Sequence, residues 1–158
     1  MSADYPSMTT AEIRSKFLNF FEERGLKLYP SSSLVPDDPS LLLANAGMNQ
    51  FKEYYQGKKT MKEIGAISCQ KCVRTNDIDC IGEDGRHLSF FEMLGDFSFG
   101  GVSKEQACAW AFELITKEFK LPLDRLYFTV FTEDDETHDV WRSLGAVSYT
   151  HLTLPTIA

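Results

Sequence analysis

Four apolar residues near the start of the chain recur at intervals of three or four residues, which is the spacing of one face of a helix. Thr9 and Glu12 come just before this series and have the spacing of a capping box, a pair that begins helices. Gly25 follows the series and is typical of a helix end. The pattern therefore predicts an amphipathic helix in this stretch. The apolar stripe consists of Ile13, Phe17, Phe20 and Phe21.

A second helical series follows a second capping box, formed by Ser103 and Gln106. After an interval, an acid-rich start at Asp134 predicts a further helix as far as Leu144, because acidic side chains favour the positive end of a helix dipole. The second series is regular enough to predict the best-defined helix of the chain. Its stripe consists of Ala107, Trp110, Ala111, Leu114 and Ile115.

Between and after these helices, short apolar and β-branched runs predict strands. Two of them are joined by a polar loop of about ten residues and predict an antiparallel pair. A short helix is expected over residues 48–55, before Gly57. The fold class is therefore α/β, in its α+β form, with a mainly antiparallel sheet flanked by helices. The expected strands are Leu26–Tyr29, Ala66–Val73, His87–Phe97 and Leu126–Phe131.

Composition narrows the class of protein. A chain of 158 residues with 43% hydrophobic residues can bury one core and predicts a single domain. The net charge of −7 argues against general electrostatic binding of nucleic acid, so any such contact must be local. Residues 1–5 lack the apolar run of a secretion signal and no stretch of about 20 apolar residues occurs, so we expect a cytoplasmic protein without a membrane partner.

Candidate chemistry centres on Arg74, at the end of one strand of the expected antiparallel pair, and on His87 and Phe91, on the returning strand. Side chains alternate along a strand, so His87 and Phe91 share one surface, with Arg74 opposite. Arginine binds phosphate or carboxylate, histidine can reach a more distal phosphate, and phenylalanine can stack on a purine. These residues suit a nucleotide. The plainer alternative is that Phe91 belongs to the core and Arg74 is a surface charge.

The same residues carry a resemblance. Arg74, a loop and His87-x-x-x-Phe91 resemble motif 2 of the class II aminoacyl-tRNA synthetases. Three further runs resemble the N-terminal catalytic region of the alanyl-tRNA synthetase family, and the likeness extends from about Thr10 to Gly145. These runs are Asn45-Ala-Gly-Met-Asn-Gln-Phe-Lys52, Cys72-Val-Arg-Thr-Asn-Asp77 and Phe90-Phe-Glu-Met-Leu-Gly95, the last followed by Phe97-Ser-Phe-Gly100.

This resemblance implies an enzyme, an alanine-tRNA ligase, that joins L-alanine to ATP as alanyl-adenylate and passes the alanyl group to the alanine tRNA. Arg74 would hold the α-phosphate and the amino-acid carboxylate, His87 would approach the γ-phosphate, and Phe91 would stack on adenine. The family commonly has two consecutive histidines where this chain has His87 and Leu88. ATP and Mg²⁺ are the implied cofactors, and we assign Mg²⁺ no ligand in this chain.

Motif 3 and the tRNA-binding and editing regions of the family would lie beyond Gly145. The early helix and the proline-containing segment Ser31–Pro39 resemble motif 1 of the class. Residues 1–146 are therefore expected to be the N-terminal part of the aminoacylation catalytic domain, with motifs 1 and 2, inactive by itself and active within a parent enzyme. The alternative is a truncated, non-catalytic paralogue that binds a nucleotide or a protein. The oligomeric state is left open.

The last segment, residues 147–158, departs from the pattern before it. It is rich in threonine and free of charge, and its start, Val-Ser-Tyr-Thr-His-Leu, resembles a translated sequencing adapter. We expect this segment to be a non-native tail. The alternative is an edge strand over residues 147–154, ended by Pro155.

Cys69 and Cys72 have the spacing of half a zinc site, but the chain contains no second close pair. The acidic run 133–136 is explained by the start of a helix. We therefore expect no metal-binding residues, and no zinc, within this chain.

Overall fold

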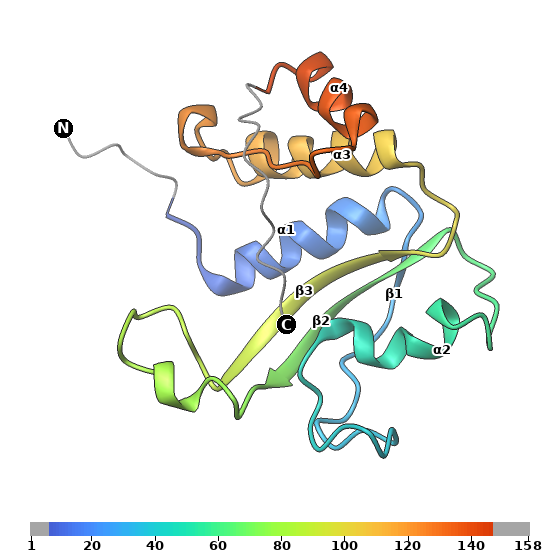
Figure 1. The fold of residues 1–158 in the computed structure, drawn as a ribbon, viewed down its shortest axis with the longest axis vertical. Helices are drawn as coiled ribbons and strands as arrows, with labels where there is room; N and C mark the ends of the chain where they lie inside the picture. The colour runs from blue at the N-terminus through green and yellow to red at the C-terminus, as the bar shows by residue number, and fades with distance from the viewer. Residues whose placement is uncertain (1–6, 147–158) are drawn as a thin grey trace. The chain divides into compact units, whose positions relative to one another are not determined.

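The computed structural model describes residues 7–146, which form parts of two compact units (Figure 1). We call residues 14–101 the sheet unit, and residues 7–13 with 102–146 the helical unit. The main elements are α1 (Thr10–Glu22), β1 (Lys27–Leu28), α2 (Lys52–Tyr55), β2 (Gly65–Val73), β3 (Phe90–Ser98), α3 (Lys104–Glu113) and α4 (Asp135–Ser143). Short 3-10 helices occur at Gly47–Phe51, Ile78–Cys80 and Leu123–Arg125, and a π-helix follows α3 at Leu114–Glu118.

The sheet unit contains a three-stranded sheet in the order β1-β2-β3. β1 runs parallel to β2, and β2 pairs antiparallel with β3 from Gly65 opposite Ser98 to Val73 opposite Phe90. The expected α+β fold is confirmed, and so is the antiparallel pair. One boundary was wrong: β3 begins at Phe90, so His87 lies in the connecting loop and not on the returning strand.

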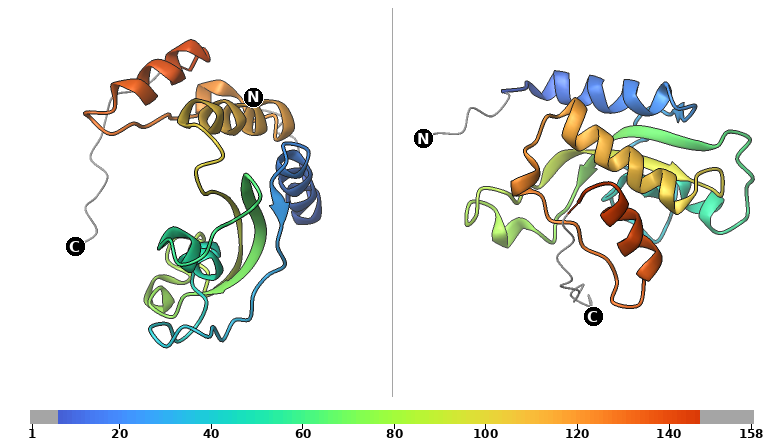
Figure 2. Two further views of the ribbon diagram at one scale, coloured as in Figure 1. Left: turned by 90° about the vertical axis from the view of Figure 1, so that its right-hand side faces the viewer. Right: turned by 90° about the horizontal axis from the view of Figure 1, so that it is seen from above.

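The two faces of this sheet are covered by different segments (Figure 2). α1 lies on one face, and the chain from Gly47 to α2 lies on the other. Because side chains alternate along a strand, each residue of β2 and β3 faces one of these segments. Buried residues of α1, of β2, of the stretch before α2 and of the connecting segments make the core of the unit: Phe17, Phe20, Phe21, Leu26, Ala44, Phe51, Ala66, Ile67 and Cys72.

α1 has the start, stripe and end that its sequence predicts. The Thr9 hydroxyl accepts a hydrogen bond from the Glu12 backbone N–H at 3.2 Å, and Glu12 in turn accepts one from the Thr9 N–H at 2.7 Å. Three phenylalanines of the helix are buried and meet edge to face. Gly25 then reverses the chain with a φ of +87°, a conformation that glycine adopts without strain.

The helical unit is held by capped helices and one aromatic cluster. The predicted capping box of Ser103 and Gln106 is present at the start of α3, and Asp134 caps α4 by accepting from the Thr137 N–H. The Phe128 ring lies between those of Phe112 and Trp141, with centroids 5.9 and 4.8 Å away. These contacts explain why Phe128 is buried.

The strand expected over Leu126–Phe131 was wrong: the described chain there forms no ladder. Phe128 and Val130 are buried while Tyr127 and Phe131 are exposed, so the side chains do alternate. Phe128 is buried in the aromatic cluster, and no strand of the described helical unit lies beside this segment to pair with it.

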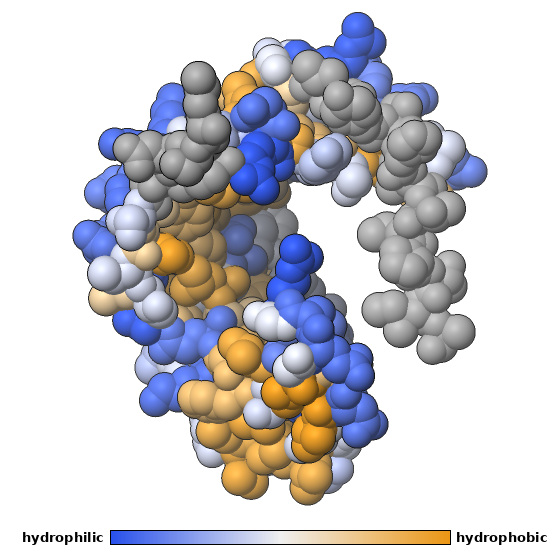
Figure 3. All heavy atoms as spheres, turned by 90° about the vertical axis from the view of Figure 1, so that its left-hand side faces the viewer, coloured by the Kyte–Doolittle hydropathy of each residue, from blue (hydrophilic) through white to orange (hydrophobic). Residues whose placement is uncertain are grey.

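Part of the surface of the sheet unit is apolar. Figure 3 shows hydrophobic side chains gathered over the lower part of this unit, where Figure 1 draws the cyan and green loops. Exposed aliphatic residues of these loops include Val35, Leu42, Ile78 and Ile81.

None of the helices within residues 7–146 is long and apolar enough to cross a membrane. The predicted tail, 147–158, lies outside the described residues.

Candidate active site

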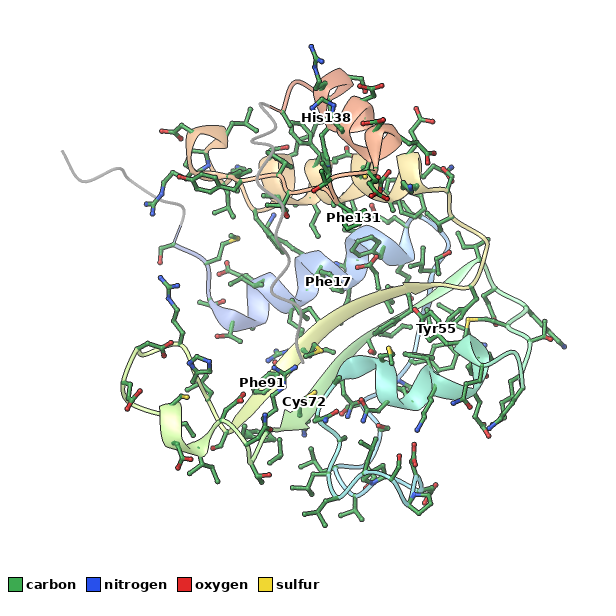
Figure 4. The ribbon with its side chains drawn as sticks, viewed as in Figure 1. Phe17, Tyr55, Cys72, Phe91, Phe131 and His138 are labelled. Atoms are coloured by element: carbon green, nitrogen blue, oxygen red, sulfur yellow. The ribbon has the colours of Figure 1, made fainter. Side chains whose placement is uncertain are left out.

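Arg74 and Phe91 lie together at the open end of the β2–β3 pair. Arg74 follows directly after β2, where its N–H donates to the Ser89 carbonyl at 2.9 Å and extends the ladder by one residue. Phe91 lies opposite Cys72, which Figure 4 shows beside it. The Arg74 guanidinium carbon is 5.2 Å from the centroid of the Phe91 ring, within the range of a cation–π contact. The structure therefore brings together two of the three predicted site residues.

A backbone carbonyl holds the Arg74 guanidinium from a second side. Its Nε donates to the Asn45 carbonyl oxygen at 3.2 Å, across 29 positions of sequence. No other hydrogen bond or ion pair of the guanidinium occurs within the described residues, so Nη1 and Nη2 keep their donors for a ligand. Arg74 is half-buried, and its charge faces no carboxylate partner there.

The segment that supplies the Asn45 carbonyl, residues 44–51, packs closely on the same face of the sheet. The Val73 N–H donates to the Ala44 carbonyl at 2.9 Å, and the Gly47 N–H points at the Met93 sulfur at 3.2 Å. A Cβ on Gly47 would lie 3.3 Å from the end of the Phe97 ring, so glycine allows this close approach. We call residues 44–51 the covering segment.

His87 lies apart from this pair, in the loop between the strands. Its Nδ1 is 2.8 Å from a carboxylate oxygen of Asp84, and its backbone N–H donates to the other oxygen at 3.0 Å. Backbone hydrogen bonds from Arg86 and His87 lower the pKa of Asp84 below its ordinary value. None of the contacts of His87 in the described structure is with Arg74 or Phe91. Strand alternation therefore does not align His87 with Phe91 as expected, because His87 lies outside β3.

The two cysteines of the Cys-x-x-Cys pair point to opposite faces of β2, since three positions along a strand reverse the side-chain direction. Burial raises the pKa of both thiols. Residues 7–146 contain no group of three or more His, Cys, Asp or Glu side chains placed to hold a metal ion.

A cavity of about 560 Å³ lies elsewhere in the sheet unit, between residues 32–39 and the start of α2. Ser32, Asp38, Gln50 and Lys52 are among its lining residues, and neither Arg74 nor Phe91 is. Lys52 and Asp38 form an ion pair there, and the hydrogen bond from Lys52 holds the pKa of Asp38 far below its ordinary value. The cavity is thus separate from the arginine site.

Sequence reasoning missed the role of two polar residues beside the site. Asn45 contributes its carbonyl, which no side-chain pattern reveals. Gln70 is 1% exposed and is hydrogen-bonded on the face that carries Arg74, and an uncharged polar residue within the apolar run of β2 was the signal that could have singled it out.

Within the described residues, the Arg74 guanidinium is fixed through Nε above a half-exposed aromatic ring, and its fork is free, an arrangement that can accept an anion. A family model described as tRNA synthetases class II (A) matches residues 12–154. The chain belongs to this family. The match confirms the resemblance found in the sequence, and it also confirms the fold class.

Curated relatives agree with this assignment. The chain is 53% identical over 131 residues to an alanine–tRNA ligase, chloroplastic/mitochondrial, of Sorghum bicolor, covering 83% of this chain and 14% of the relative. It is 51% identical over 142 residues to an alanine–tRNA ligase of Synechocystis, covering 90% and 16%. It is 49% identical over 140 residues to that of Pseudothermotoga lettingae, covering 89% and 16%. The chain thus spans about one-seventh of the length of the relatives it matches.

Proposed function

We propose that this class II synthetase chain is part of an alanine–tRNA ligase, which activates L-alanine with ATP and then transfers it to the alanine tRNA. Similarity to enzymes of that name over 83–90% of the chain supports this function. The single structural observation that carries the proposal is the Arg74 guanidinium, held by the Asn45 carbonyl and the Phe91 ring with its fork unpaired within the described residues.

Arg74 fits the first step of this reaction. A carboxylate oxygen of alanine attacks the α-phosphorus of ATP, the bond to the bridging oxygen breaks, and pyrophosphate leaves. The two reacting groups are both anionic, so they repel each other on approach. A guanidinium fork that contacts both offsets this repulsion and stabilises the charge that develops at phosphorus. We propose Arg74 as the catalytic residue in this sense.

Phe91 is proposed to stack on adenine, and its half-exposed ring at the site supports this role. His87 is proposed to approach the γ-phosphate. Its place in a loop that turns at Gly82 and Gly85, both with positive φ, supports an approach by loop adjustment and not from a fixed strand position. Mg²⁺ enters this proposal as part of the ATP substrate, bound to its phosphate oxygens, and no described residue is assigned as its ligand.

A cytoplasmic location is kept as part of the proposal, and the four free cysteines support a reducing compartment. Some relatives are named chloroplastic/mitochondrial, so the alternative is the interior of an organelle. A fluorescent fusion of the whole coding sequence, followed by microscopy of its host cell, distinguishes the two.

The function is tested by exchange of labelled pyrophosphate into ATP, catalysed by a full-length synthetase that contains this sequence. We expect exchange that depends on alanine and is weak with serine or glycine. The 158-residue chain serves as the comparison, and we expect it to be inactive, because Arg74 and Phe91 are too few groups to complete the site. Exchange with another amino acid, or none with alanine, would overturn the proposal. ATP binding without any exchange would favour the non-catalytic paralogue.

A further inference from the structure

The side chain of Gln70 makes a hydrogen-bond network that is unusually complete for a buried amide. Its Oε1 accepts from the Ser32 N–H at 2.8 Å, the Ser32 hydroxyl at 3.1 Å and the Gln50 Nε2 at 3.2 Å. Its Nε2 donates to the carbonyls of Ser32 at 3.2 Å and Lys71 at 2.8 Å. The backbone partners fix the direction of the amide, because an N–H only donates and a carbonyl only accepts.

This network connects β2 to the covering segment, residues 44–51. Gln50 belongs to that segment, and Gln70 and Arg74 lie four positions apart on the same face of the strand. A Cβ added to Gly47 would lie 3.7 Å from the Cβ of Gln70, so the backbone of the segment packs directly on the Gln70 side chain. Gln70 therefore holds the segment whose Asn45 carbonyl holds Arg74.

A buried amide at this position is stable only if its polar atoms are hydrogen-bonded, whereas an apolar side chain would need no such partners. Removing it takes a partner from the Ser32 N–H and from the Lys71 carbonyl, and leaves the Ser32 carbonyl with only the Ser31 hydroxyl at 3.2 Å. Partly buried polar groups that lose their partners destabilise the fold. An apolar residue would pack beside the Phe97 ring, which lies on the same face of the sheet, without needing partners. The amide instead fixes the position of the backbone that it bonds, at Ser32 and Lys71. Apolar contacts would fix that position less narrowly, because they are not directional.

We propose that Gln70 is a positioning residue for Arg74. Through Gln50 and the close packing at Gly47 it fixes the covering segment, the Asn45 carbonyl of that segment fixes the guanidinium Nε, and the fork is thereby held ready for the anions. The effect of Gln70 on catalysis rests on the proposed function. Its effect on the position of the Arg74 side chain rests on the geometry alone.

The matched control lies on the same strand. Ser68 is fully buried on the same face of β2, and its hydroxyl has no hydrogen-bond partner among the described residues. Ser68→Ala therefore changes a buried polar group of β2 without touching the network. Gln50→Met is a milder variant, because Gln50 is half-buried and supplies only one of the bonds to Gln70.

The first test measures the order of Arg74 directly in the 158-residue chain. The Arg74 Nε–H is identified in ¹H–¹⁵N spectra by its loss in Arg74→Lys, and its exchange with water is measured. We expect faster exchange by on the order of tenfold in Gln70→Met, a smaller increase in Gln50→Met, and none in Ser68→Ala. Unchanged exchange in a folded Gln70→Met chain would overturn the proposal, whatever the enzyme catalyses. Should Gln70→Met not fold, Gln50→Met alone decides.

The second test is a double-mutant cycle in the full-length synthetase. We expect Gln70→Met to lower kcat of pyrophosphate exchange on the order of tenfold with little change in KM for ATP, because misplacing a catalytic group costs mainly transition-state contacts. In an Arg74→Ala background the same change should have almost no further effect. Independent, multiplying losses would show a general structural role and overturn the inference. An inactive wild-type synthetase would overturn the proposed function instead. The exchange of the Arg74 Nε–H with water would still test whether Gln70 positions Arg74.

Discussion

The two faces of the β2–β3 pair each carry an arginine, and the two are held in opposite ways. On the face toward α1, Arg14 donates through Nε at 3.0 Å and through Nη2 at 2.7 Å to one carboxylate oxygen of Glu92. On the other face, Arg74 donates through Nε to a neutral carbonyl and lies over a ring. One guanidinium has a charged partner, and the other has contacts that direct it without neutralising it.

This difference distinguishes an arginine whose charge is paired from one whose charge has no carboxylate partner among the described residues. The Glu92 hydrogen bonds raise the pKa of Arg14, and Arg14 in turn lowers the pKa of Glu92, so each ion stabilises the other. An anionic substrate would have to displace Glu92 to bind Arg14. At Arg74 no carboxylate has to leave, and the positive charge is available at once. Free donors in a fixed direction, and not the residue type, distinguish the two positions.

The largest expected effect comes from Arg74→Ala in a full-length synthetase that contains this chain. We expect pyrophosphate exchange to fall by about 10²-fold or more, the scale of losing a preorganised donor to developing charge. Steady-state exchange kinetics measure this. Arg14→Ala is the matched control on the opposite face and should leave kcat within about twofold. Equal losses in both variants would remove the distinction between the two arginines.

Phe91→Ala is expected to have the next largest effect. It should raise KM for ATP about tenfold with a smaller change in kcat, because base stacking is worth on the order of 1–3 kcal/mol and is present in both ground and transition states. Phe90→Ala is the control, since Phe90 is exposed and points to the other face. If KM for ATP stays constant in Phe91→Ala, the ring is a packing residue and its proposed contact with adenine is wrong.

Arg14→Ala should have a modest effect of another kind, on stability. The Arg14 and Glu92 side chains are 36% and 32% exposed, so solvent and salt screen their interaction. We expect a small fall in Tm at low salt that shrinks as salt is added, measured by thermal unfolding of the 158-residue chain. Arg74→Ala should lower Tm less, because Arg74 has no ion-pair partner among the described residues. A reversed order would mean that Arg74 is the structural residue.

The smallest expected effect is the pH dependence of the Glu92 pair. Hydrogen bonding to Arg14 lowers the pKa of Glu92 from an ordinary value of 4.5, so the carboxylate stabilises the fold above that value and loses its contribution as the pH falls through the lowered pKa. The difference in Tm between wild type and Glu92→Gln should therefore shrink between about pH 6 and about pH 3. A difference that grows toward acid would contradict the pairing.

Much of the fold could be predicted because its signals are local. The capping boxes at Thr9 and Ser103, the apolar stripes and the glycine after α1 act within a few residues, and each is present as expected. The expected strand over Leu126–Phe131 failed for the complementary reason. Alternation indicates which side chains are buried, but a strand also needs an adjacent strand to which its backbone can hydrogen-bond. The described helical unit contains no such strand.

The site divides in the same way. The sequence by itself determined that Arg74 ends a strand and that Phe91 returns beside it, since an antiparallel pair and its alternation are written in the residue pattern. It did not determine that His87 lies outside the strand against Asp84, because the boundary of β3 depends on pairing and not on apolar character.

Only the tertiary structure decided which arginine is free. Arg14 and Arg74 have the same side chain, and Glu92 and Asn45 lie 78 and 29 positions away from them. The partner of each depends on how α1 and the covering segment fold onto opposite faces of one sheet. Long-range contacts of this kind have no signature in a single sequence. Whether a guanidinium binds a carboxylate or a backbone carbonyl depends on which of them lies beside it, and how buried it is there, once the chain has packed.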